Sequence, residues 1–245
     1  MGIVTAIWEK WVEFKYEWLK ITAAAMVSPL LYMIALGWGL GSMTSMDNIR
    51  YIDFLVPGLI AMSTMNNSFS SVATALNTQR IFEHSFEQII ISPTSLGQYV
   101  IGQSIGGSLR GIYSGILVLL IALPFGVSLK LSPIFFLVMF LNGLAFGSLG
   151  VLAAILSVTH SDVGRFSTFI IAPMTFLCNT LFPLDKIPRV IQVLIQLLPL
   201  THASSQLRSI SYGQPASLFS ILVLTAYSVV FILLSVFFIN KRKNL

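Results

Sequence analysis

Charged side chains are scarce in this sequence, and their scarcity excludes an ordinary water-soluble protein. Only 9% of the 245 residues are Asp, Glu, Lys or Arg, whereas 56% are hydrophobic. Soluble globular chains carry roughly a quarter charged residues. A chain with so few charges cannot cover a surface that faces water, so the composition indicates a protein surrounded mostly by lipid.

Cysteine and histidine are also rare, which excludes two kinds of stabilising site. The single cysteine, Cys178, rules out an internal disulfide. One cysteine with three histidines (His84, His160 and His202) offers no zinc-binding spacing, so no metal site is predicted. The net charge is +5, but the basic residues do not cluster with aromatic ones, so no nucleic-acid partner is predicted.

Catalytic motifs are absent from the sequence. It contains no G-x-x-x-x-G-K-[ST] loop for nucleotide phosphates, no H-E-x-x-H and no G-x-S-x-G. His160 and Asp162 are close in sequence, but they fall in a polar connection where a solvated pair is the expected state. We therefore predict no enzymatic activity and no cofactor on this chain itself.

The first residues predict an amphipathic helix over 3–19 and not a cleavable signal peptide, because charges interrupt them. One face carries apolar residues at helical spacing: Ile3, Ile7, Trp11, Phe14 and Trp18. The other face carries Glu9, Glu13, Glu17 and Lys20. A Trp-rich helix of this kind is typical of the membrane surface, and packing on a soluble partner is the alternative. The apolar run that follows at once favours the membrane surface.

Six segments are apolar and long enough to be membrane spans, which need about 20 residues each. They are residues 21–42, 52–77, 97–125, 132–157, 167–183 and 217–239. The third contains Arg110, and the fifth is short and contains Pro173. The sequence thus predicts an all-α polytopic membrane protein.

The basic residues predict that both termini face the cytoplasm, because short cytoplasmic connections are enriched in Lys and Arg. On this topology the cytoplasmic set is larger: Lys10, Lys15, Lys20, Arg80, Arg165, Lys241, Arg242 and Lys243. The outer set is smaller: Arg50, Lys130, Lys186, Arg189 and Arg208.

Two connections have patterns of their own. Residues 79–91 predict a short amphipathic helix on the cytoplasmic side, with Phe82, Phe86, Ile89 and Ile90 on one face and Glu83 and Glu87 on another. Residues 183–216 are too long for a turn and too apolar for a solvated loop. They predict a helical segment in the outer interface or partway into the membrane.

Polar residues inside spans are costly in lipid and therefore informative. Arg110 lies about 20 Å along its span; it either contacts an anionic substrate or lipid headgroup, or snorkels or bridges helices. Asn66, Asn67 and Asn142 either line a pathway or bond between helices. Glycines at intervals of four, Gly107, Gly111 and Gly115 with Gly143 and Gly147, predict close helix packing.

Four segments in order resemble the ABC-2 type transporter permeases, most closely the drug-export and nodulation-factor-export branch. They are PLLYMIALGWGLGSM at 29–43, YIDFLVPGLIAMSTM at 51–65, FEQIIISPTSLGQYVIGQ at 86–103, and IAPMTFLCNTLFPLDKIPRVIQVLIQLLPLTHASSQLRSI at 171–210. The resemblance covers essentially the whole chain, and the last segment is its most specific part. The chain lacks the R-Y-x-x-S-x-L-G-x-x-W start of the O-antigen and teichoic-acid permeases, which argues against export of long polymers.

The resemblance implies six transmembrane helices after an interfacial elbow helix at 3–19. It further implies a coupling helix at 79–91 that docks on a separate ATPase, and an extracellular re-entrant hairpin at 184–212. Two permease chains and two ATPase chains would form the exporter, with ATP and Mg on the ATPase.

We therefore expect the permease subunit of an ATP-driven exporter, in the plasma or bacterial inner membrane, for an amphipathic or lipid-linked substrate. Two alternatives remain open: a non-transporting membrane anchor or assembly subunit, and a membrane-embedded enzyme. The enzyme is disfavoured because no His, Asp and Glu cluster lies at one membrane depth.

Overall fold

The computed structural model describes residues 2–40, 45–46, 49–83, 85–86, 88, 95–182 and 188–243. Its long helices are α1 (Gly2–Tyr32), α2 (Tyr51–Ile81), α4 (Leu96–Ala122), α5 (Pro133–Leu156) and α10 (Leu218–Lys243). Shorter helices are α6 (His160–Phe166), α7 (Ala172–Leu177), α8 (Arg189–Gln196) and α9 (Pro199–Ser211), with π-helical η1 (Met33–Leu40) and η3 (Ser167–Ile171) and the 3-10 turn η2 (Leu123–Phe125). The strands β1 (Ser45–Met46) and β2 (Ile49–Arg50) form a small antiparallel pair. The all-α class is confirmed apart from this pair.

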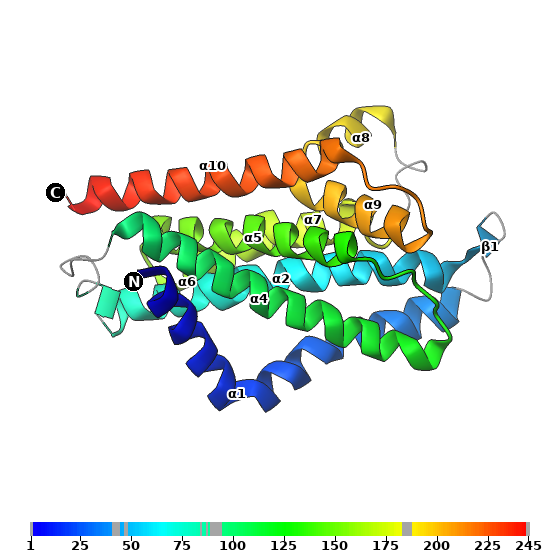
Figure 1. The fold of residues 1–245 in the computed structure, drawn as a ribbon, viewed down its shortest axis with the longest axis horizontal. Coiled ribbons are helices and arrows are strands. Elements are labelled where there is room, and N and C mark those ends of the chain that lie inside the picture. Colours follow the sequence, from blue (N-terminus) through cyan, green and yellow to red (C-terminus); the bar gives the residue numbers. More distant parts are fainter. Residues whose placement is uncertain are drawn as a thin grey trace.

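Helices α2, α4 and α5 form the centre of the bundle, and glycine allows their close approach (Figure 1). A Cβ added at Gly107 would lie 3.1 Å from the carbonyl oxygen of Ser68 on α2. One at Gly143 would lie 2.7 Å from Oγ of Ser108 on α4. The predicted glycine faces are thus confirmed as packing faces, where backbones approach because no side chain intervenes.

A second glycine face of α4 receives the first part of α1. A Cβ at Gly102 would lie 2.7 Å from Cβ of Ala6, and one at Gly106 would lie 2.8 Å from Cγ of Lys10. Gly102 and Gly106 are again four positions apart, but they contact α1, whereas Gly107 contacts α2. Helix α4 therefore lies between α1 and α2, with glycines on both sides.

Helix α1 contains both the predicted elbow helix at 3–19 and the start of the span predicted from 21. The structure has one continuous helix over Gly2–Tyr32, and Figure 1 shows that it bends sharply into two arms. The hydroxyl of Thr22 donates to the carbonyl of Trp18 at 2.5 Å and contacts the hydroxyl of Tyr113 on α4 at 2.7 Å. A threonine hydroxyl bonded four residues back is a known cause of helix bending.

Four helical segments are long and apolar enough to cross a membrane: Gly2–Gly37, Leu96–Phe125, Pro133–Leu156 and Leu218–Lys241. The predicted count of six is therefore not reached in the part of the chain that the structure describes. Helix α2 has the length, with 31 residues, but carries many polar ones. The predicted fifth span begins with η3 and α7, and the helix ends at Leu177 before Asn179, which has a positive φ of 55°.

The connections sort to the two ends of the bundle as the topology predicted. Both termini, the end of α2 and the start of α4 lie at one end, on the left of Figure 1. The β1–β2 pair, α8 and α9 lie at the other end. Predicted cytoplasmic and outer connections are therefore separated, which any membrane orientation of this chain requires.

The predicted outer segment folds as two helices of different exposure. Helix α9 packs against α2 and α5, and its Arg208 lies over the ring of Phe54, with the guanidinium carbon 3.7 Å from the ring centre. Arg208 also donates to the carbonyl of Asn179 at 2.8 Å. Helix α8, in contrast, exposes an apolar face that includes Val190, Val193 and Leu194. A helix with such a face is suited to an apolar environment and not to water.

We predict that Gly58→Ala destabilises the fold, because an added Cβ would lie 2.8 Å from the carbonyl carbon of Thr180, and backbone does not move aside cheaply. Overpacking of this kind costs about 1–3 kcal/mol. The measurement is the thermal unfolding midpoint of the protein in detergent. The matched control is Gly164→Ala, where nothing lies within 4 Å and helix propensity favours alanine. An unchanged midpoint for Gly58→Ala would contradict this packing.

Candidate functional site

The predicted ATPase-coupling residues lie where α2 ends. Helix α2 includes positions 79–81, so this segment begins as its last turn. Phe82 is 64% exposed and Glu83 is exposed, whereas Phe86 is 4% exposed and its ring centre lies 6.4 Å from that of Tyr99 on α4. Glu87, Ile89 and Ile90 fall outside the described residues. The two phenylalanines thus have different environments: Phe82 points outward, and Phe86 anchors the segment to the bundle.

The end of α2 is fastened to the connection between α5 and α6. The guanidinium of Arg80 donates to the carbonyl oxygens of Ala154, Ile155 and Ser157. These carbonyls at a helix C-terminus have no partner within their own helix, so a cation is well placed there. Sequence reasoning did not assign this role to Arg80, since its partners are more than 70 positions away.

His160 has a specific partner, which corrects the prediction of a solvated His160–Asp162 pair. Nδ1 of His160 lies 3.0 Å from Oδ1 of Asn77, and its ring packs against that of Phe82. Asp162 instead caps α6 by accepting from the backbone N–H groups of Thr159 and Val158, which lower the pKa of its carboxyl.

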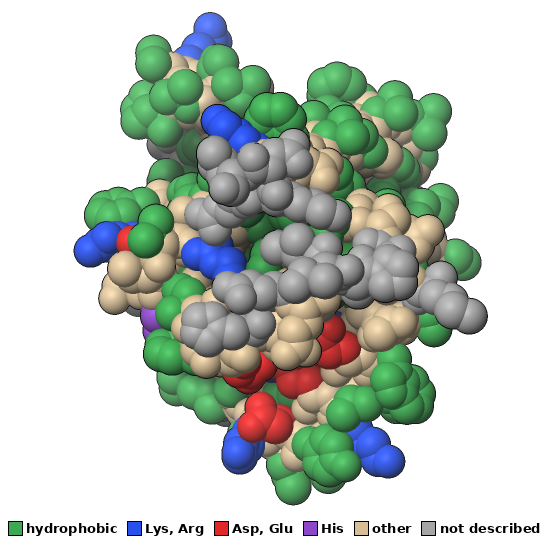
Figure 2. Space-filling model, turned by 90° about the vertical axis from the view of Figure 1, so that its left-hand side faces the viewer, with side chains coloured by type: hydrophobic (Ala, Val, Ile, Leu, Met, Phe, Trp, Pro, Cys, Tyr) green, Lys and Arg blue, Asp and Glu red, His purple; other side chains and the backbone are tan. Residues whose placement is uncertain are grey.

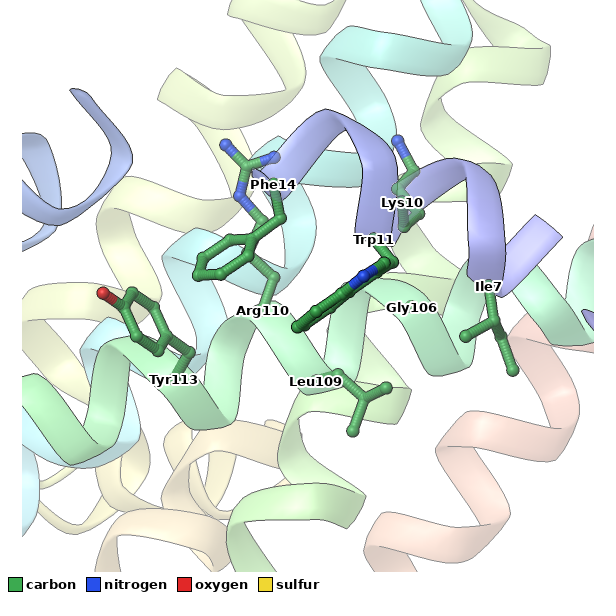
Figure 3. Close-up of a pocket in the computed structure, with 8 residues that line it drawn as sticks. All are labelled: Ile7, Lys10, Trp11, Phe14, Gly106, Leu109, Arg110 and Tyr113. Atoms are coloured by element: carbon green, nitrogen blue, oxygen red, sulfur yellow. The ribbon is translucent and has the colours of Figure 1, made fainter. Parts of the chain in front are cut away.

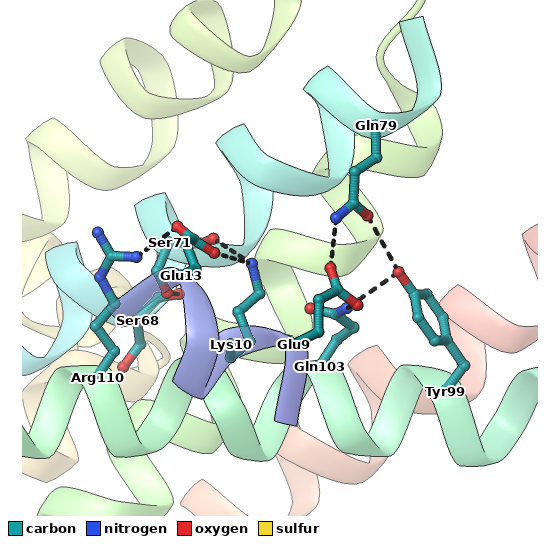
Figure 4. A network of polar contacts seen from close by, with 9 residues as sticks. All are labelled: Glu9, Lys10, Glu13, Ser68, Ser71, Gln79, Tyr99, Gln103 and Arg110. Carbon is teal, nitrogen blue, oxygen red and sulfur yellow. Dashed lines mark hydrogen bonds and ion pairs between the residues drawn. The ribbon is translucent and has the colours of Figure 1, made fainter. Parts of the chain in front are cut away.

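A polar network joins the first arm of α1 to α2 and α4 (Figure 4). The carboxylate of Glu9 accepts from the side-chain amides of Gln79 on α2 and Gln103 on α4. Gln103 also donates to the hydroxyl of Tyr99 at 3.0 Å, and Tyr99 donates to Gln79 at 3.4 Å. Because Tyr99 also contacts Phe86, this network links α1 to the predicted coupling segment.

Arg110 bridges two helices through an ion pair beside this network. Its Nη1 donates to Oε1 of Glu13 on α1 at 2.8 Å. Nζ of Lys10 donates to Oε2 of Glu13 and to the carbonyl of Ser71, each at 3.0 Å. Lys10 is only 6% exposed, so these bonds replace its hydration. Glu13 is the partner that the sequence analysis did not identify for Arg110.

The three asparagines of the predicted pathway occupy different positions. Asn142 is fully buried and donates to the carbonyl of Ala61, so it joins α5 to α2. Asn67 donates to the carbonyl of Ser63 and to Oγ of Ser114 at 2.7 Å, yet remains partly accessible. Asn66 is partly accessible as well. The structure brings Asn67 and Arg110 together and places Asn142 in the core.

A polar groove of about 300 Å³ lies between α1, α2 and α4. Its lining is Glu13, Glu17, Asn67, Ser70, Ser71, Thr74, Ala75 and Arg110. The accessible positions of α2 in this region are mostly polar and repeat at helical spacing: Asn66, Asn67, Ser70, Thr74 and Thr78. Hydroxyls and amides on one accessible helix face can hydrogen-bond a polar solute or water. We call these five residues the polar face of α2.

The end of the molecule that carries both termini has an uneven charge distribution. Figure 2 shows acidic side chains gathered on one side of this end and basic side chains spread around it. Within the described residues, no group of three or more His, Cys, Asp or Glu is placed to hold a metal ion. The site is therefore one of polar contacts, ion pairs and exposed aromatic side chains.

Comparison with known proteins places this architecture in a family. The sequence profile of the ABC-2 type transporter matches residues 1–212. The chain is 28% identical over 243 residues to Nodulation protein J of Rhizobium leguminosarum bv. viciae, covering 97% of this chain and 93% of that protein. It is 29% identical over 211 residues to Nodulation protein J of Rhizobium meliloti (strain 1021), covering 84% and 80%.

A third relative carries a functional name of its own. The inner membrane transport permease YadH of Escherichia coli (strain K12) is 30% identical over 206 residues, covering 83% of this chain and 80% of YadH. The match of the family profile to most of the chain agrees with the helical bundle and its membrane-spanning segments. This multi-pass membrane protein belongs to the ABC-2 type transporter family.

Proposed function

We propose that this chain is the membrane-spanning subunit of an ATP-driven exporter for an amphipathic or lipid-linked substrate. A separate ATPase, in two copies, would bind ATP and Mg and supply the energy. The polar face of α2 carries the proposal, because accessible hydroxyls and amides on a long helix of an apolar bundle are expensive against lipid. The relative named as an inner membrane transport permease supports the same role and location.

The proposed exporter is a homodimer with six spans in each chain. Helix α2 would be the second span, with its polar face turned to a second copy and not to lipid. The segment that begins with η3 and α7 would be the fifth span, with α6 on the cytoplasmic side before it. Two polar faces placed opposite each other would enclose a hydrated pathway, with Asn67 and Arg110 at its wall.

The coupling role is proposed for the segment that follows α2. Phe82 and Glu83 are exposed beside the α5–α6 connection, where Val158 is exposed too. Apolar side chains in such a position are suited to a groove on a partner protein. Phe86 would act differently, since its contact with Tyr99 passes any movement of the segment to α4 and, through the Glu9 network, to α1.

A non-transporting anchor subunit is the second candidate function. It is favoured by the ion pair between Arg110 and Glu13, because this pair already compensates the charge of the guanidinium without a bound substrate. An anchor would still need the ATPase contact but would require no pathway along α2.

We predict that Phe82→Ala weakens association with the proposed ATPase partner and lowers substrate-stimulated ATP hydrolysis. Truncating an aromatic anchor typically costs about 2 kcal/mol, or roughly thirtyfold in affinity. The measurements are co-purification and hydrolysis by the reconstituted complex. Phe237→Ala, equally exposed on α10, is the control and should behave like the parent. If Phe82→Ala associated with the ATPase and hydrolysed ATP like the parent protein, the proposed contact at Phe82 would be contradicted.

We predict that a cysteine on the polar face of α2 forms a disulfide between two copies. In a Cys178→Ala background, Thr74→Cys should give a covalent dimer on mild oxidation of membranes, because the face is accessible and would meet its symmetry mate. Non-reducing gels provide the measurement. Thr225→Cys, exposed on α10, should stay monomeric. Equal cross-linking of both variants, or of neither, would argue against a dimer built on α2.

We predict that both termini face the cytoplasm, with the α9–α10 connection outside. Single cysteines replace Lys241 and Gln214, which are exposed at opposite ends of the bundle, in the Cys178→Ala background. An impermeant thiol reagent applied to spheroplasts should label position 214 and spare position 241 until the membrane is opened. Labelling at position 241 alone would show the opposite topology, with both termini outside.

A further inference from the structure

The first turns of helix α1 present Trp8 and Trp11 outward and charged residues inward, whereas Lys15, Glu17 and Lys20 farther along the helix are exposed. Trp8 and Trp11 are 65% and 56% exposed, whereas Lys10 is buried and Glu9 and Glu13 bond to groups on α2 and α4. A helix of a soluble protein has the opposite arrangement. The outward face of these first turns is therefore suited to contact with an apolar medium.

An apolar groove of about 160 Å³ runs between this face and α4. Figure 3 shows Ile7, Trp11 and Phe14 from α1 above Leu109 and Tyr113 from α4. Gly106 forms part of the wall, and its missing side chain lets the stem of Lys10 pack closely against α4.

The two cations that line the groove contribute only their aliphatic stems. In Figure 3 the charged ends of Lys10 and Arg110 point away from the apolar rings. Both ends are engaged on the other side of α1, by Glu13 and by the carbonyl of Ser71. Arg110 thus also lines the polar groove, so a single ion-paired layer separates a polar groove from an apolar one. A ligand of the apolar groove needs no charge.

The groove continues into the outward face of α4. Leu109, Tyr113, Ile116 and Leu120 follow each other at helical spacing, and all but Tyr113 are at least 38% exposed. The α4 wall belongs to a segment apolar enough to cross a membrane, and the α1 wall exposes Trp11 beside it. The groove therefore opens sideways onto the surface that lipid covers, and not onto an end of the bundle where a soluble partner would approach.

We propose that this groove is a binding site for one acyl chain of a membrane phospholipid. Pockets for whole drug-sized ligands measure about 300–1,000 Å³, so the smaller groove suits a single chain. Burial of the chain among aromatic and branched side chains provides the attraction. A chain bound there excludes water from the apolar side of the layer formed by Lys10, Glu13 and Arg110, and so strengthens these ion pairs. The proposal does not depend on what the protein exports.

The test uses Trp11 as a reporter in the full chain, with Trp8, Trp18 and Trp38 replaced by Phe. The protein is reconstituted in phosphatidylcholine vesicles with increasing fractions of phosphatidylcholine brominated on its acyl chains, which quenches tryptophan on contact. The matched reporter keeps Trp18, which is exposed on the same helix but outside the groove, and replaces Trp8, Trp11 and Trp38. We expect half-maximal quenching of Trp11 at about a threefold lower fraction of brominated lipid, because a site concentrates the chain.

A second experiment fills the groove with a larger side chain. Leu109→Phe in the Trp11 reporter should shift its quenching curve to that of Trp18, whereas Leu233→Phe on the exposed face of α10 should leave it unchanged. Superimposable quenching curves for the Trp11 and Trp18 reporters would contradict the proposal, since lipid would then contact both residues equally without a specific site. A Trp11 that no brominated lipid quenches would overturn it too, because protein would then cover the groove.

Discussion

A charge removed from water must be paired or hydrogen-bonded, and the structure of this chain depends on that constraint around Glu13. One carboxylate receives both Lys10 from its own helix and Arg110 from α4. Lys10 also reaches the backbone of α2 at Ser71, so three helices meet at one ion-paired point. Removing one partner from such a group leaves an uncompensated charge, at a cost of about 3–5 kcal/mol when it is buried.

The glycine faces explain how these side chains reach each other. Long helices carrying bulky residues pack about 8–10 Å apart, whereas glycine permits closer approach. Gly102 and Gly106 bring α1 onto α4, and Gly107 and Gly111 bring α2 onto the next face of the same helix. The backbone carbonyl of Ser71 on α2 can then accept a hydrogen bond from Lys10 of α1, whose partner Glu13 also binds Arg110 of α4. Close packing and polar pairing are therefore one arrangement and not two separate features.

Features that depend on local spacing were predictable from the sequence, and features that depend on distant pairing were not. The apolar runs of α5 and α10 and the glycine spacing of α4 follow directly from residue type and position. Glu13 and Arg110 are 97 positions apart, and Asn77 and His160 are 83 apart. Periodicity places each residue on a helix face but cannot name the helix that this face meets.

Helix boundaries illustrate the same distinction. The sequence predicted an elbow helix over 3–19 followed by a span from 21, and α1 runs through both with a bend, because α2 and α4 supply partners for Glu9, Lys10 and Glu13. In the fifth predicted span the apolar pattern extends to residue 183, whereas the helix ends at Leu177. There the backbone turns at Asn179, whose neighbour Thr180 packs on Gly58 of α2. Tertiary contacts decide both boundaries.

The contact of Arg80 with the end of α5 has a mechanical consequence. The guanidinium of Arg80, by holding the carbonyls of Ala154, Ile155 and Ser157, ties the parallel helices α2 and α5 together at their C-terminal ends. A displacement of the residues after α2 would therefore move the ends of α2 and α5 together. Such a joint transmits displacement along the bundle without requiring either helix to bend.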